Sequence, residues 1–130
     1  MMLMLKYALN LNPKKSAKAY GRSLNISTKS SVILCRHISG MNVAKAKSLL
    51  QDLTDGKRDI EGKYYTNASR EILSVMKSAE SNAEFKGLDT GRLVIFASAH
   101  KGFTFHRPRR TKMKSTTKKM TNIQVVLQQK

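Results

Sequence analysis

The stretch Arg92–Lys130 constrains the fold most, because it holds two strand-like runs separated by a long basic segment. The runs are LVIFASA (Leu93–Ala99) and NIQVVL (Asn122–Leu127). Both are rich in β-branched residues and partly alternate, which predicts half-buried strands. Consecutive strands pair most simply as antiparallel neighbours. The segment between them is therefore predicted to be an extended hairpin, with its loop near Lys112–Thr117.

This predicted hairpin arm, at about residues 100–120, is strongly basic. No Asp or Glu follows Asp89. An isolated two-stranded ribbon is marginally stable in water, and like charges across it lower its stability further. Because an extended strand rises about 3.3 Å per residue, the arm spans roughly 40 Å from Lys101 to Lys114. We expect a polyanionic partner to order it.

The charge is concentrated at the two ends of the chain. The 130 residues carry a net charge of +17. Residues 1–51 contain nine Lys or Arg and no acid, whereas residues 90–130 contain ten and no acid. A nearly neutral centre with basic ends is typical of nucleic-acid binding. The length predicts a single domain with a globular body at about 1–99 and 121–130.

Helical periodicity predicts three helices in the middle of the chain. Their expected caps are, in chain order, Ser27 and Gly40, Asn42 and Gly56, and Thr66 and Gly87. The first two are predicted to form an αα-hairpin, and the third, about Asn67–Lys86, is the longest. The first helix should point Val32, Ile33 and Ile38 inward, with Cys35 nearby. The apolar stripe of the third comprises Ala68, Ile72, Leu73, Val75, Met76, Ala79, Ala83 and Phe85.

The separation of helical and alternating patterns predicts an α+β fold. We expect three helices on one face of a small antiparallel sheet, with a long basic β-hairpin extension. The sheet combines the two C-terminal runs with a strand within Ala17–Ile26. The apolar N-terminus MMLMLKYALNL is too short to span a bilayer, so no membrane partner is expected.

The residue pattern does not indicate catalysis. The histidines His37, His100 and His106 have no carboxylate or cysteine at metal-ligand spacing, and the single Cys35 excludes an internal disulfide. There is no glycine-rich phosphate loop. We expect no enzyme activity, no metal and no cofactor.

The basic residues carry the chemistry that remains, which is neutralisation of phosphate charge. The predicted RNA-binding residues are Lys14, Lys15, Lys18, Arg22, Lys29, Lys101, Arg107, Arg109, Arg110, Lys118 and Lys119. Phe103 and Phe105 share one side of an extended chain. Either they stack on RNA bases or they pack against the body at the base of the hairpin.

Several segments resemble the universal large-subunit ribosomal protein family twenty-two, called seventeen in older eukaryotic naming. KYALNLNPKKSAKAYGRSLNI (Lys6–Ile26) is similar to the family's archaeal and eukaryotic opening. ISGMNVAKAKSLLQDL (Ile38–Leu53) is similar to the family's Ile-x-Gly-Met motif and the helix that follows it. SAESNAEFKGLDTGRLVI (Ser78–Ile95) is the most specific match. RPRR (Arg107–Arg110) and NIQVVL complete a resemblance over nearly the whole chain.

The chain departs from the family pattern at three places. The loop Thr54–Gly62 is shorter than in most eukaryotic members. The family's Gly-Arg pair at the arm tip is replaced by Lys112, Met113, Lys114 and Ser115. A family histidine before the last strand is replaced by Asn122.

The resemblance implies a structural protein of the large ribosomal subunit in the cytoplasm. Its expected partners are large-subunit rRNA, neighbouring ribosomal proteins and, at the arm tip, the nascent polypeptide. In that arrangement the tip residues Lys112, Met113, Lys114 and Ser115 face the peptide exit tunnel. A free basic nucleic-acid-binding regulator is the alternative; co-sedimentation with large subunits separates the two.

Overall fold

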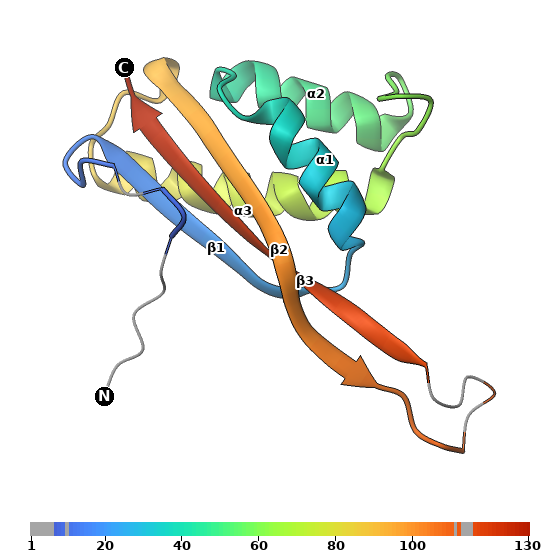
Figure 1. Cartoon of the computed structure of the whole chain (residues 1–130). Coiled ribbons are helices and arrows are strands. Elements are labelled where there is room, and N and C mark those ends of the chain that lie inside the picture. Colours follow the sequence, from blue (N-terminus) through green and yellow to red (C-terminus); the bar gives the residue numbers. More distant parts are fainter. Residues whose placement is uncertain (1–6, 10, 111, 113–115) are drawn as a thin grey trace, which may run out of the picture.

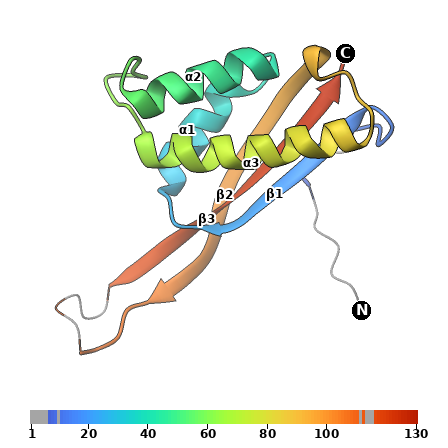
Figure 2. The same ribbon diagram turned by 180° about the vertical axis from the view of Figure 1, so that it is seen from behind.

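The computed structural model describes residues 7–9, 11–110, 112 and 116–130, and confirms the α+β class. Its elements are β1 (Ser16–Leu24), α1 (Thr28–Ile38), α2 (Val43–Asp55), α3 (Thr66–Phe85), a short 3-10 turn η1 (Thr90–Arg92), β2 (Leu93–His106) and β3 (Thr117–Gln129). The antiparallel sheet has the order β1-β3-β2. The helices lie on one side of it (Figures 1 and 2). None of the described helices is long and apolar enough to cross a membrane.

Two predicted N-caps are confirmed by their hydrogen bonds. The Ser27 side chain accepts from the amide of Ser30, at 3.4 Å, and the Asn42 side chain accepts from the amide of Ala44, at 3.0 Å. Gly56 ends α2 in the left-handed region, at φ 74°. Such caps satisfy backbone groups that have no partner within the helix.

Other predicted boundaries were wrong by one or two residues. Helix α1 ends at Ile38 with Ser39 as its C-cap, and Gly40, at φ 88°, follows as the left-handed residue. Thr66 is the first residue of α3 and not its cap, because the Tyr65 carbonyl already accepts from Ser69. Helix α2 continues through Asp55, so the loop predicted to begin at Thr54 starts later.

The predicted αα-hairpin was also wrong. Helix α1 packs mainly on β2, whereas α2 packs on α3. The link between them follows the outer edge of β2. Gly40 donates to the Ile95 carbonyl, the Ile95 amide donates to Met41, and the Ser39 hydroxyl bonds both backbone groups of Ala97. The link therefore covers the edge of β2 instead of joining two antiparallel helices that pack against each other.

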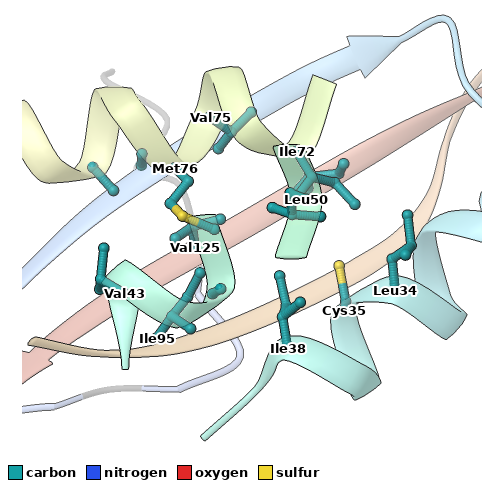
Figure 3. Close-up of a cluster of buried hydrophobic side chains, with 14 of the residues drawn as sticks. Leu34, Cys35, Ile38, Val43, Leu50, Ile72, Val75, Met76, Ile95 and Val125 are labelled. Carbon is teal, nitrogen blue, oxygen red and sulfur yellow. The ribbon is translucent and has the colours of Figure 1, made fainter. Parts of the chain in front are cut away.

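The core lies between the sheet and the helices (Figure 3). Helix α1 contributes Leu34, Cys35 and Ile38 to the core, so the inward position predicted for Ile38 is confirmed. Val32 and Ile33 were also predicted inward but are only half-buried, and of the two it is Ile33 that packs against the core. Phe85, predicted in the α3 stripe, is 94% exposed. It follows Ala83 by two residues, which turns it about 200° around the helix, away from the core.

Strand β1 approaches α3 closely at Gly21. A Cβ atom there would lie 2.8 Å from Val75 Cγ2. Two polar side chains at the C-terminal end of α3 hydrogen-bond the outer edge of β1. Asn82 Nδ2 donates to the Lys18 carbonyl, at 2.8 Å, and Nζ of the C-cap residue Lys86 donates to the Ser16 carbonyl, at 3.0 Å. Thus Asn82, part of the most specific family motif, has a structural role in the sheet.

Candidate nucleic-acid interface

The far ends of β2 and β3 form a two-stranded ribbon. The last pair between β1 and β3 is Leu24↔Thr121. Beyond it β2 and β3 pair with each other through Thr104↔Lys119, Phe105↔Lys118 and His106↔Thr117. We call the segments 101–106 and 117–120 the ribbon; Figure 1 shows their ends lying beyond the helices.

Three of the arginines predicted to bind RNA lie past the end of β2, outside the paired strands of the arm. The strand ends at His106, and Arg107, Arg109 and Arg110 belong to the connection to β3. Pro108 explains this boundary, because proline has no N–H to donate to a ladder. Arg107 still donates its amide to the Thr116 carbonyl, at 3.2 Å.

The predicted loop near Lys112–Thr117 therefore begins earlier, since the strands end at His106 and resume at Thr117. Lys112, one of the four predicted tip residues, is exposed. Met113, Lys114 and Ser115 lie outside the described residues.

The predicted basic residues of the N-terminal part lie along β1 and its preceding turn. Lys14 and Lys15 are exposed in that turn, and Arg22 is exposed near the end of the strand. Lys18 is half-buried, with Nζ 5.0 Å from the centroid of the Tyr7 ring. This distance is within the range of a cation–π contact.

The fold brings Lys29 and Lys101 to the root of the ribbon from distant parts of the sequence. Lys101 pairs with Thr121 in the sheet. The Thr121 hydroxyl lies 2.8 Å from that of Thr28, the neighbour of Lys29, and donates to the Ile26 carbonyl, at 2.8 Å. Lys118 and Lys119 continue this basic surface along β3, half-buried and exposed respectively.

Asn122 joins the irregular parts of two strands, a role that sequence reasoning missed. Its Oδ1 accepts from the amide of Ser23, at 2.8 Å, and its Nδ2 lies 3.2 Å from His100 Nε2. Ser23 has a φ of 53° where the β1 register shifts. A Cβ atom at Gly102 would lie 2.7 Å from Asn122 Oδ1. Gly102 inside a strand pattern was the available signal, because such glycines mark bulges.

All acidic residues lie between Asp52 and Asp89 in the sequence. The ion pairs among the described residues join Lys47 to Glu80 at 2.6 Å, Arg58 to Asp52 at 3.7 Å and Arg92 to Asp89 at 3.6 Å. These pairs use bases outside the predicted RNA-binding set. The positive potential of the ribbon is therefore not neutralised by nearby carboxylates.

The cysteine and the acids do not form a chemical site in the described part of the chain. Burial raises the pKa of Cys35 to about 12, so its thiol stays neutral and unreactive at ordinary pH. No group of three or more His, Cys, Asp or Glu residues is placed to hold a metal ion within the described ranges.

Aromatic side chains gather on the sheet face opposite the helices. Tyr7 and Tyr20 pack edge to face at a centroid distance of 6.1 Å, and Tyr20 lies 6.3 Å from the ring of His100. Partial burial, with a smaller contribution from Tyr20, raises the pKa of Tyr7. Phe103 and Phe105 are 66% and 47% exposed, so they do not pack against the body. Of the two alternatives stated for them, only an external contact remains.

A family model and several related proteins all indicate the same family for this chain. Residues 19–128 match the family model described as ribosomal protein L22p/L17e. The chain is 35% identical to the large ribosomal subunit protein uL22 of Methanococcus aeolicus, over 96% of this chain and 97% of that protein. It is 37% identical to uL22 of Methanococcus maripaludis strain S2 / LL, over 98% and 99%. Identity to uL22 of Methanocaldococcus jannaschii is 34%, over 82% and 81%.

Proposed function

The chain belongs to the ribosomal protein L22p/L17e family, and from this premise we propose that its basic ribbon holds it in the rRNA of the large subunit. It is a structural, non-enzymatic constituent of the large subunit of the cytoplasmic ribosome. The family match through residue 128, which includes the whole ribbon, is the observation that carries the proposal. Ribosomal RNA and neighbouring ribosomal proteins are its partners.

The proposed rRNA contacts form two groups. One group lies along β1 and its preceding turn, and comprises Lys14, Lys15, Lys18 and Arg22. The other group begins with Lys29 of α1 at the root of the ribbon and continues along the ribbon and its connection. It comprises Lys29, Lys101, Arg107, Arg109, Arg110, Lys118 and Lys119. Each cation neutralises a phosphate and releases counterions, so these contacts contribute affinity and position rather than base specificity.

The proposal divides the chain into a body, at about 1–99 and 121–130, and an arm, at about 100–120. We further propose that the arm tip, Lys112 to Ser115, faces the nascent polypeptide in the wall of the exit tunnel. Support for this comes from family membership and from the position of Lys112 in the connection between the end of β2 and the start of β3. The division into body and arm and the tunnel-facing tip are both proposals that family membership alone does not establish.

Sedimentation of tagged variants tests these roles. Arg107→Ala, Arg109→Ala and Arg110→Ala together are expected to lower the fraction of protein in large subunits on a sucrose gradient. Removing one phosphate-binding side chain should reduce the slope of log affinity against log salt by roughly 0.7–0.9. The matched control replaces three exposed lysines of the body, Lys45, Lys57 and Lys77, by alanine.

The tip variant separates tunnel contact from rRNA contact. Lys112→Ala, Met113→Ala and Lys114→Ala together should leave incorporation nearly intact and alter only the passage of particular nascent chains. If the tip variant leaves the particles as readily as the arginine variant, the tip is an rRNA anchor and the division is wrong. If the unaltered chain does not sediment with large subunits at moderate salt, a free nucleic-acid-binding protein is favoured instead.

A further inference from the structure

The helices cover one face of the sheet, and the opposite face is covered only in part. There the Ala8 amide donates to Gln124 Oε1, and Gln124 and Val126 are buried, whereas His100 nearer the ribbon is exposed. We call this second face the open side. The helices cover the side on which Leu93 and Ile95 of β2 are fully buried, as Figures 1 and 2 show. The even-numbered residues of β2 up to His100 therefore point to the open side. Even-numbered residues of β3 share this side, because Asn122 contacts His100 there.

A bulge in β2 changes which residues of the ribbon reach the open side. Between Lys101 and Thr104, Gly102 and Phe103 of β2 lie opposite Met120 alone. One extra residue reverses the alternation of side chains along the strand. After the bulge Phe105 pairs with Lys118, so the odd-numbered residues of β2 now point to the open side. Phe103 and Phe105 thereby join His100 on one face.

These rings lie on both neighbours of β3, Tyr20 on β1 and the other three on β2. Tyr20 pairs with Gln124, His100 with Asn122 and Phe105 with Lys118, while Phe103 lies in the bulge facing Met120. The β3 partners thus recur at every second residue, which is a spacing of about 6.7 Å along a strand. Tyr20 and His100 already contact each other, with Tyr20 Oη 3.4 Å from His100 Nε2 and the two rings tilted by 49°. The exposed rings of Phe103 and Phe105, farther along the ribbon, are therefore the ones left free to stack on bases.

The lysines around these rings favour a negatively charged partner. Lys118 lies on the same face as Phe105, and Lys101 and Lys119 flank the ribbon on its other face. No acid follows Asp89 in the sequence. A partner must therefore combine flat apolar surfaces with a regular negative charge. Unpaired nucleotides do so, whereas a duplex keeps the faces of its bases stacked inside.

We propose that the open side of the ribbon, with Phe103 and Phe105 and the adjoining His100, is a stacking platform for unpaired rRNA bases. The proposal rests on the proposed function, because it names the part of the rRNA that this face contacts. It separates two tasks: the lysines and arginines neutralise phosphates, and the rings bind bases. The bulge at Gly102 is what places the rings on one side.

Binding of short RNAs by the full chain tests the platform. The variant is Phe103→Ile with Phe105→Ile, which keeps apolar bulk and strand propensity but removes the aromatic faces. Its affinity for single-stranded oligoadenylate should fall by about tenfold per ring, with an unchanged salt slope. Affinity for an RNA duplex of matched charge should not change. The control is Phe85→Ile, which alters an exposed ring on α3 away from this face.

The outcomes distinguish this proposal from the proposed function. If the double variant binds oligoadenylate as well as the unaltered chain does, the stacking platform is wrong, while salt-dependent RNA binding and subunit incorporation still support the proposed function. If the unaltered chain neither binds RNA nor enters large subunits, the proposed function itself fails.

A crosslinking experiment in assembled subunits tests the kind of partner. A photo-crosslinking phenylalanine analogue at position Phe103 should form adducts with rRNA bases. The same analogue at Phe85 serves as the control on the body. Adducts of the Phe103 position with protein only would overturn the proposal in favour of a protein-docking face.

Discussion

Strand β3 passes through two different environments, and the contrast separates the body from the ribbon. Between β1 and β2 its residues Ile123, Val125 and Leu127 are fully buried under the helices. In the ribbon its residues 117–120 pair only with β2, and all are exposed or half-buried. A two-stranded ribbon without a packed face gains little free energy from apolar burial. We therefore expect the ribbon part of β3 to open locally far more easily than its part in the body.

The body and the ribbon also differ in whether their basic side chains have acidic partners and whether their strand edges are covered. The body pairs bases with acids, as in Lys47–Glu80, and covers the edges of its sheet with Asn82, Lys86 and the α1–α2 link. The ribbon lies after the last acidic residue of the sequence, so all of its charged side chains are basic. We therefore expect the body to fold alone and the ribbon to become fully ordered only on a polyanion.

Hydrogen exchange should show the largest difference. In the free protein at low salt, amides of Ile123, Val125 and Leu127 should exchange roughly 10³-fold or more slowly than those of the ribbon, because body amides open only by near-global unfolding. NMR-detected exchange measures this ratio, and added rRNA should protect the ribbon alone. Dispersed, protected amides throughout 103–120 without RNA would contradict the comparison.

Truncation of one large side chain in each region should give a smaller but clear contrast. Leu50→Ala removes a fully buried side chain of α2 and should lower the free energy of unfolding by about 2–5 kcal/mol. Phe105→Ala, its counterpart in the ribbon, should change that free energy by less than about 0.5 kcal/mol. Urea unfolding followed by circular dichroism provides both values. Equal losses would mean that the ribbon belongs to the cooperative unit of the body.

The close approach of β1 to α3 allows a sharper test of packing in the body. Gly21→Ala places a Cβ 2.8 Å from Val75 Cγ2, so the free energy of unfolding should fall by about 1–3 kcal/mol. Gly91→Ala is the control, because its Cβ would meet only Asp89 Oδ1, at 3.4 Å. Thermal unfolding of both variants checks this, and a stable Gly21→Ala variant would show that strand and helix can separate at little cost.

The hydrogen bonds at the edge of β1 should give the smallest effect. Lys86→Met keeps the length of the side chain but removes its bonds to the carbonyls of Pro13 and Ser16. We expect a loss of about 0.5–1.5 kcal/mol in the free energy of unfolding. Lys77→Met, an exposed change on the same helix, is the matched control. Identical denaturation midpoints for the two variants would show that the edge of β1 needs no cover.

Local patterns in the sequence predicted the elements and the chemistry of the surface. Ser27 and Asn42 identified two helix starts, and the two C-terminal runs identified β2 and β3. These signals are readable because a cap, a helical stripe and a strand alternation each depend on residues a few positions apart. The absence of acids after Asp89 likewise predicts a polyanionic partner without any knowledge of the fold.

Only the tertiary structure decided how these elements meet. The predicted αα-hairpin failed because the α1–α2 link binds β2, a partner more than fifty residues away in sequence. The face occupied by Phe105 depends on the two residues of β2 opposite Met120, and strand register is set by pairing across the sheet. Asn122 contacts Ser23 and His100 for the same reason. Periodicity is local, but register and edge contacts arise from the packing of distant segments.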